Sequence, residues 1–198
     1  MRGNMRSLKS LVLASASPRR KEILERTGLL FTIDAGDLEE TIVAGMSPHV
    51  LAKGLSRRKA EAVAARRRNA LIIAADTLVV FRGKIFGKPH TASEAKRMLG
   101  ILSGKRHSVI TGFTIFDTDT GKSLTRSVET TVYFRRMSRQ EIEGYVATGE
   151  PLDKAGGYAI QGMGGVFIRM IEGDYYNVMG LPLGEVVAGL KKFGIAVV

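Results

Sequence analysis

The segment of residues 11–20 most constrains the fold, because an apolar run there leads directly into a helix start. Residues 11–14 have the composition of a short buried strand. Ser17 is then a preferred N-cap residue, and Pro18 suits the first position of a helix that Gly28 would close. The chain is therefore expected to begin with a strand, a tight loop and a helix.

The rest of the chain predicts further strands and helices. Alternating residues on both sides of the turn at 117–121 predict a long antiparallel hairpin, so the sheet should be mixed. The other expected strands are 31–34, 71–81, 85–86 and 166–171, and the other expected helices are 48–69, 91–102, 138–148 and 182–193. The glycine-rich segment 149–165 predicts a functional loop in which backbone passes close to another group.

Length and composition indicate one globular domain over residues 1–198, since the chain contains no internal repeat and no flexible linker. It has no cysteine, which excludes disulfides and fits a reducing cytoplasm. It also has no apolar segment near the roughly 20 residues of a membrane helix. The net charge of +11 indicates a polyanionic partner, either a nucleic acid or a small phosphorylated substrate.

The start of the first helix is a candidate phosphate site. A helix N-terminus presents unpaired N–H groups and the positive end of the helix dipole. Ser15 and Ser17 add hydroxyl groups, while Arg19 and Arg20 add planar guanidinium groups that match phosphate oxygens. The alternative is an ordinary capped helix with two arginines exposed to solvent.

Asp76 is the strongest candidate for chemistry, because a carboxylate that follows the apolar residues 72–75 needs a partner. It could bind a metal ion or take a proton from water. The alternative is a structural aspartate that is hydrogen-bonded by Thr77 or by a backbone amide. Lys59 and Lys88 could contact phosphate or could be surface lysines.

Two loops add weaker candidates. Glu40, with Asp37 and Glu39, could help to hold a hard cation, or could form a solvated acidic turn. Gln161 follows a glycine-rich turn and offers both a donor and an acceptor to a nucleobase edge, unless it is only a surface residue. His107 has no metal-ligand spacing and is expected to be structural or exposed. The chain has no Walker-type loop.

Taken together, these motifs resemble the Maf nucleotide pyrophosphatases, a family also known as septum-formation inhibitors. The resemblance spans nearly the whole chain, and the ordered set of motifs is far more specific than any one of them. The motifs are Leu11-Val12-Leu13-Ala14-Ser15-Ala16-Ser17-Pro18-Arg19-Arg20, Ala75-Asp76-Thr77, Gly87-Lys88-Pro89, Leu102-Ser103-Gly104-Lys105 with His107, Asp153-Lys154-Ala155-Gly156, and Gly180-Leu181-Pro182-Leu183.

The resemblance implies an α/β fold similar to that of the inosine triphosphate pyrophosphatases, with a mixed, twisted central sheet, flanking helices and two lobes around a cleft. It implies a cytoplasmic enzyme, possible homodimers, and a divalent cation, Mg²⁺ or Mn²⁺. Ser17-Pro18-Arg19-Arg20, Asp153-Lys154-Ala155-Gly156 and Gln161 are similar to the branch that converts dTTP and UTP to monophosphate and pyrophosphate. Such enzymes clear nucleotide pools, with a possible link to cell division arrest.

The resemblance also implies roles for individual residues. Asp76 corresponds to the catalytic base, and Glu40 and Asp76 are the candidates for metal binding. The substrate-binding residues would be Ser15, Arg19, Arg20, Glu40, Lys59, Thr77, Lys88 and Gln161. Among them, Arg19, Thr77 and Gln161 match the positions that are linked to substrate specificity.

The alternative function is a nucleic-acid-binding regulator of septum formation, which the net charge of +11 favours. The basic clusters 57–59 and 66–68 have helical spacing, however, and the second is typical of a solvated helix face. The chain lacks interleaved aromatic residues that would stack on bases. A nucleoside triphosphate is therefore the expected partner, whereas a nucleic acid or a membrane is not.

Overall fold

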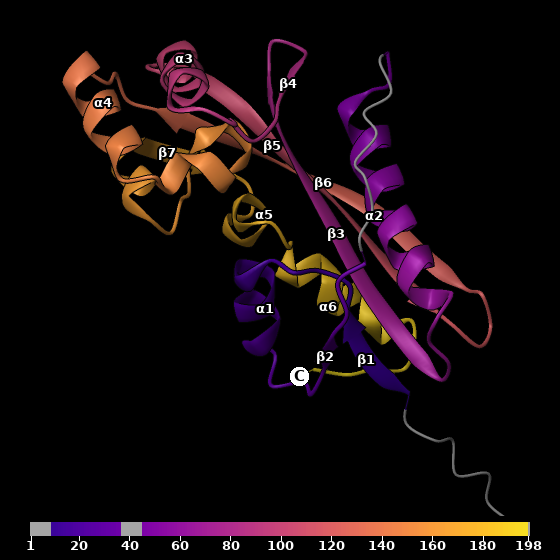
Figure 1. Ribbon diagram of the computed structural model, residues 1–198. Helices are drawn as coiled ribbons and strands as arrows, with labels where there is room; N and C mark the ends of the chain where they lie inside the picture. The colour runs from indigo at the N-terminus through magenta and orange to yellow at the C-terminus, as the bar shows by residue number, and fades with distance from the viewer. Residues whose placement is uncertain (1–8, 37–44, 198) are drawn as a thin grey trace, which may run out of the picture.

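The computed structural model describes residues 9–36 and 45–197. Their core is a mixed seven-stranded sheet in the order β2-β1-β3-β5-β6-β7, and β4 pairs with β3 outside this path (Figure 1). The strands are β1 (Ser10–Leu13), β2 (Thr32–Ile33), β3 (Ala70–Phe81), β4 (Lys84–Phe86), β5 (Arg106–Asp117), β6 (Ser123–Phe134) and β7 (Ile168–Glu172). β1 is parallel to β2 and β3, and the other pairs are antiparallel. The predicted mixed α/β fold is confirmed.

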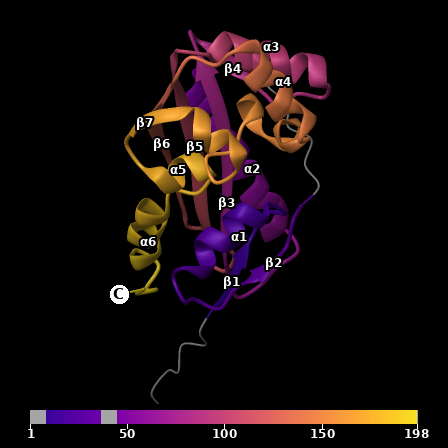
Figure 2. The same cartoon turned by 90° about the vertical axis from the view of Figure 1, so that its left-hand side faces the viewer.

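The helices cover both faces of this sheet (Figures 1 and 2). They are α1 (Pro18–Glu25), α2 (Pro48–Ala64), α3 (Ala92–Leu102), α4 (Arg139–Ala147), α5 (Tyr175–Met179) and α6 (Leu183–Lys191). Three short 3-10 helices, η1 (Glu150–Asp153), η2 (Ala155–Gly157) and η3 (Met163–Phe167), connect α4 to β7. Successive side chains of a strand point to opposite faces, so the residues of β3 alternate between the two helix layers.

Four buried clusters show how these layers pack. On one face, α2 is the one described helix, and it forms two clusters with alternate residues of β3, among them Ile72 and Leu78. On the other face, α1, α5 and α6 pack near Ile73, and α3 and α4 pack near Val79. We call these last two groups the lower region and the upper region, as they appear in Figure 1.

Most predicted elements are present, with two corrections. The sequence predicts a second helix that continues to about residue 69, but α2 ends at Ala64. Just beyond this end, Arg66 and Arg67 both form ion pairs with Asp34. Asn69 then takes a positive φ of 49° and turns the chain into β3. The short helix α5 was not predicted, because its five residues are too few for a helical pattern.

The glycine-rich segment expected as a loop forms η1, η2 and η3 together with the turns between them. Positive φ angles at Gly149, Gly156 and Gly157 show why glycine is used in this segment. Within the described residues, no helix has the length and apolar character needed to cross a membrane.

Candidate active site

The candidate site lies at an opening in one edge of β3. β5 pairs along one edge of β3, from Leu71 to Val80. Along the opposite edge, β1 pairs only with residues 70–73 and β4 only with residues 79–81. No described strand therefore pairs with residues 74–78 on that edge, and Asp76 and Thr77 lie in the middle of this interval.

The loop between β1 and α1 forms the lower border of the opening. The Ser15 hydroxyl is buried and accepts hydrogen bonds from the Ser17 amide at 3.2 Å and from Arg20 Nη1 at 3.3 Å. Ser17 is the N-cap of α1 and Pro18 occupies its first turn, as predicted. The Ser17 side chain makes no capping hydrogen bond, so Ser15 is the hydroxyl that organises this turn.

Arg20 ties this loop to two other segments. Its Nε donates to the Gly180 carbonyl at 2.8 Å, and its Nη2 donates to Thr77 Oγ1 at 3.1 Å. Thr77 Oγ1 also lies 3.0 Å from Thr111 Oγ1, which donates to the Asn177 carbonyl. One guanidinium thus joins the β1–α1 loop, β3 and the turn after α5.

Asp76 lies on the opposite face of β3 from Thr77 and is only 4% exposed. Its carboxylate forms an ion pair with Lys59 of α2, which supplies the counter-charge that a buried carboxylate requires. Gly112 of β5 is directly opposite Asp76 in the sheet, and a Cβ there would lie 2.2 Å from the Ala52 carbonyl group of α2. The missing side chain lets α2 approach the sheet at this position.

Arg19, the second residue of α1, lies close to acidic residues of η1. Burial lowers the pKa of Arg19, while the nearby carboxylates of Asp153 and Glu150 act in the opposite direction. Lys154 forms an ion pair with Asp153, so two cations and two carboxylates lie close together here. Arg19 therefore has different neighbours from Arg20, which is engaged with Thr77 and Gly180.

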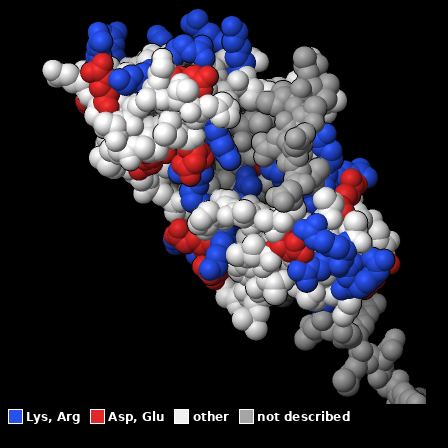
Figure 3. Space-filling view, viewed as in Figure 1, with Lys and Arg blue, Asp and Glu red and all other residues white. Residues whose placement is uncertain are grey.

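Lys88 follows β4 at the upper border of the opening, and Gln161 follows η2, which is attached to the same segment. Phe86 of β4 is opposite Val79, so residues 87–88 continue along the β3 edge toward Thr77. The Gly156 amide donates to the Gly87 carbonyl at 3.0 Å, which attaches η2 to this segment. Lys88 is exposed, and Gln161 is exposed in the turn between η2 and η3. Figure 3 shows lysine and arginine side chains near the middle of this face, between the upper and lower regions.

The acidic loop that carries Asp37, Glu39 and Glu40 lies outside the described residues. Among the residues that are described, no three His, Cys, Asp or Glu side chains form a cluster suited to a metal ion. Asp76 is the one metal candidate from the sequence that can be placed. A Mg²⁺ ion commonly uses one or two protein carboxylates and completes its shell with substrate phosphates and water, so one buried carboxylate fits a metal that binds with the substrate.

His107 is structural, which is one of the two outcomes expected from the sequence. It is 3% exposed, lies edge-on to Phe134 and Tyr158, and places Nε2 2.7 Å from the Tyr158 hydroxyl. Burial lowers its pKa from 6.5 to about 4. The imidazole is therefore neutral at pH 7 and supports the segment that follows η2.

Sequence reasoning missed Gly112, Thr111 and Glu150. A glycine inside a strand was the available signal for Gly112, since such a glycine often marks a close backbone approach. Thr111 and Glu150 have no comparable local signal, because their partners are distant in the sequence.

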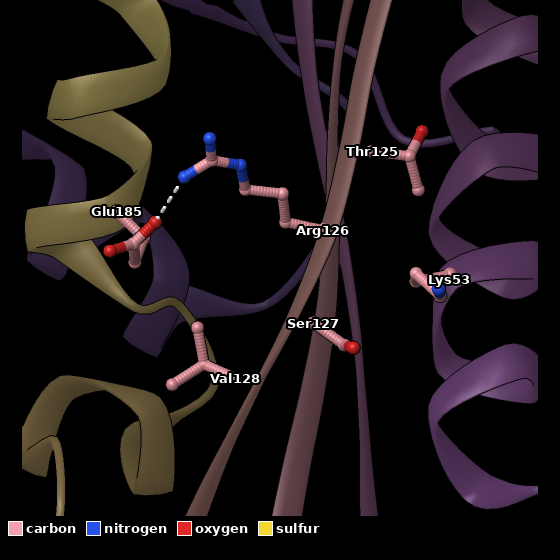
Figure 4. Close-up of a pocket in the computed structure, with 6 residues that line it drawn as sticks. All are labelled: Lys53, Thr125, Arg126, Ser127, Val128 and Glu185. Atoms are coloured by element: carbon pink, nitrogen blue, oxygen red, sulfur yellow. Dashed lines mark hydrogen bonds and ion pairs between the residues drawn. The ribbon is translucent and has the colours of Figure 1, made fainter.

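A separate hollow of about 540 Å³ lies at the β6 edge (Figure 4). Thr125 and Ser127 lie toward Lys53 of α2, whereas Arg126 lies toward Glu185 of α6, to which it donates at 2.7 Å. Ser127 is two strands away from Asp76 across the sheet. The hollow contains none of the residues predicted for the site, and we do not assign the active site to it.

Comparisons with known proteins agree with the motifs. The family described as "Maf-like protein" matches residues 10–193. A dTTP/UTP pyrophosphatase of Moorella thermoacetica is 47% identical over 190 residues, which cover 96% of this chain and 98% of that protein. Proteins of the same name from Bacillus cereus and Geotalea uraniireducens are each 46% identical, and the matches cover 96% of this chain and 93% and 98% of those proteins.

Proposed function

Because the chain belongs to the Maf-like protein family, we propose that it hydrolyses dTTP and UTP to the monophosphate and pyrophosphate. The observation that carries this proposal is the opening in the β3 edge. There the strand that carries the buried Asp76 pairs with β1, and the loop after β1 leads into the arginine-rich start of α1. A triphosphate that entered the opening would meet a carboxylate at one point and cationic groups at its border.

In the proposed mechanism, Asp76 takes a proton from a water molecule whose oxygen attacks the α-phosphorus. The bond from that phosphorus to the bridging oxygen breaks, and pyrophosphate leaves with the electron pair. Lys59, already paired with Asp76, favours the ionised carboxylate before the attack. Arg19, Lys88 and the amides at the start of α1 would stabilise the charge that grows on the phosphate oxygens.

A divalent cation would neutralise part of the triphosphate charge and polarise its oxygens. We propose that Asp76 holds the ion together with the phosphates and that Glu40 supplies a second carboxylate. Ser15 and Arg20 keep the β1–α1 turn in shape, since the Ser15 hydroxyl accepts hydrogen bonds from both Ser17 and Arg20. This turn then presents its amides without reorganisation when the substrate binds.

For substrate choice, we propose that Gln161 contacts the base and that Arg19 contacts the substrate from the opposite border. Thr77 would act through Arg20 and Thr111, because its hydroxyl oxygen is hydrogen-bonded to both. In the cell, the enzyme would clear pyrimidine triphosphates in the cytoplasm as a homodimer, with a link to cell division arrest. Light scattering of the purified protein tests the dimer.

The test of the proposed activity is Asp76→Asn. We expect this variant to lower kcat for dTTP and UTP by at least ~10²-fold, because a positioned general base contributes about that much. Pyrophosphate and inorganic phosphate are measured separately, with Mg²⁺, with Mn²⁺ and after chelation. Chelation should abolish turnover of the wild-type enzyme.

Asp117→Asn is the matched control, since Asp117 is also a buried strand carboxylate paired with a lysine, Lys9. That variant should keep activity within about twofold of wild type, because Asp117 pairs with Leu71, well away from Asp76 along β3, and substitutions outside a site usually have small effects. Near-normal turnover in Asp76→Asn would remove Asp76 from the mechanism. Salt-sensitive DNA binding without pyrophosphate release would favour the nucleic-acid-binding alternative.

A further inference from the structure

We propose that Glu150 is a positioning residue for pyrimidine selection, because its one carboxylate organises both the Gln161 turn and the surroundings of Arg19. The inference rests on the proposed function, in which Gln161 and Arg19 contact the substrate. Glu150 itself need not touch the nucleotide. It acts through the backbone that carries Gln161 and through charge near Arg19.

The hydrogen bonds of Glu150 concentrate on the turn that follows Gln161. Its Oε2 accepts from the Met163 amide at 3.0 Å, and its Oε1 accepts from the Gly164 amide at 3.1 Å and from the Tyr145 hydroxyl at 2.8 Å. Two successive backbone amides at the start of η3 are thus fixed by one side chain from η1. The position of Gln161, two residues before Met163, depends on this attachment.

Close packing shows that the attachment is built for glycine. A Cβ at Gly162 would lie 2.4 Å from a Glu150 oxygen, and one at Gly164 would lie 2.6 Å from the Tyr145 hydroxyl. Both distances are far below normal contact. The backbone can therefore approach Glu150 and Tyr145 this closely only because residues 162 and 164 have no side chains.

The same carboxylate acts on Arg19. Glu150 and Asp153 are the two carboxylates that favour the charged form of Arg19 against its partial burial. Burial raises the pKa of Glu150, but hydrogen bonds from Tyr145, Gly164 and Met163 outweigh it and hold the pKa below its usual value. Glu150 is thus ionised at neutral pH, is hydrogen-bonded to the backbone that follows Gln161, and is close enough to Arg19 to favour its charged form.

The experiment compares Glu150→Gln, Tyr145→Phe and the control Asp117→Asn. Glutamine keeps the size of the side chain but replaces one acceptor oxygen with an NH₂ group, which cannot accept an amide hydrogen bond. Asp117 is a suitable control, because it too accepts backbone amide hydrogen bonds, from Asp119 and Thr120, at the far end of the sheet. For each protein, kcat/KM is measured with UTP, dTTP, CTP and GTP.

We expect Glu150→Gln to lower the ratio of kcat/KM for UTP over GTP by about 10-fold or more, as loss of a charged hydrogen bond does. Tyr145→Phe leaves both backbone contacts in place and should lower the ratio by about threefold. Hydrogen exchange should become faster at the amides of residues 162–165 in Glu150→Gln and not across the whole sheet. Asp117→Asn should leave the ratio unchanged.

A merely structural role for Glu150 would lower kcat/KM for all four nucleotides in proportion, and that result would overturn the inference. An unchanged ratio would do the same. Calorimetric measurement of UTP and GTP binding to the same proteins tests the role of Glu150 in selectivity independently of hydrolysis. If wild-type protein prefers UTP but releases no pyrophosphate, the proposed hydrolysis fails while the role of Glu150 is still decided by the binding ratio.

Discussion

Different kinds of contact stabilise the lower border and the upper border of the β3 opening. At the lower border, the Arg20 side chain contacts three segments directly, through Ser15, Thr77 and Gly180. At the upper border, the Glu150 carboxylate binds backbone amides in a chain of short 3-10 turns. The first arrangement fixes a cationic turn against a sheet, whereas the second fixes the path of a loop.

This difference suggests a division of labour. Phosphates are common to all nucleoside triphosphates, so in the proposed function the rigid turn held by Arg20 serves every substrate, while Arg19 beside it takes part in substrate choice. Bases differ, and a loop whose path depends on few contacts can change its selectivity without disturbing the sheet. The predictions below test whether the two borders are separable in stability, in pH response and in catalysis.

The largest expected effect is at Gly112 of β5, which lies opposite Asp76 on β3, between the two borders. Gly112→Ala would place a Cβ 2.2 Å from the Ala52 carbonyl of α2, and a backbone carbonyl cannot move aside easily. We expect the free energy of unfolding to fall by about 3 kcal/mol, at the upper end of overpacking costs. Urea denaturation measures this change.

The control for Gly112→Ala lies on the same helix that the new Cβ would strike. Gly54 of α2 has open space around its Cβ position and lies inside the helix. Gly54→Ala should therefore stabilise the protein by about 0.5–1 kcal/mol, since alanine is the better helix former. Equal effects of the two substitutions would show that the packing of α2 on the sheet does not require glycine at position 112.

The two borders also differ in how far the sequence predicts them. The strand, the Ser17-Pro18 cap and the arginines of the lower border are neighbours in the sequence, so local patterns identify them. Two partners of Arg20, Thr77 and Gly180, are 57 and 160 residues away, and no local pattern reveals that they anchor it.

At the upper border, the glycines in the sequence predict that the backbone passes close to another group, but they do not identify that group. Glu150 binds amides 13 and 14 residues later, and its neighbours do not mark it as special. The sheet was predictable because alternation along β5 and β6 is a repeated pattern. The site depends on single long-range contacts, each of which occurs once.

Low pH should destabilise the upper region through the buried His107. The buried His107 has a folded pKa of about 4, below the unfolded value near 6.5. The unfolded chain therefore binds the proton first, and stability is lost as the pH falls from 6.5 to 4. The slope approaches about 1.4 kcal/mol per pH unit, or about 3 kcal/mol in total.

His107→Gln should remove this part of the pH dependence of unfolding, measured by urea titration at pH 4 to 7. His90→Gln is the control, because His90 is exposed in the loop before α3. If the upper region is separable, hydrogen exchange at pH 4.5 should accelerate first in α3, α4 and the segment after η2. A uniform acceleration that includes β1 and α1 would contradict the separation of the two regions.

The smallest expected effect is on catalysis, and it comes from a change at the lower border. Arg20→Lys keeps the charge at the lower border but cannot reach three acceptors with the planar geometry of arginine. We expect kcat/KM to fall by about 10-fold, the cost of one charged hydrogen bond, and to fall equally for UTP, dTTP, CTP and GTP. Arg26→Lys is the control, because Arg26 follows the same helix and its side chain contacts the exposed Glu22 and the Tyr176 ring. A change in the UTP-to-GTP ratio in Arg20→Lys would show that Arg20 takes part in base selection together with Arg19, and the two borders would then have to be treated as one recognition unit.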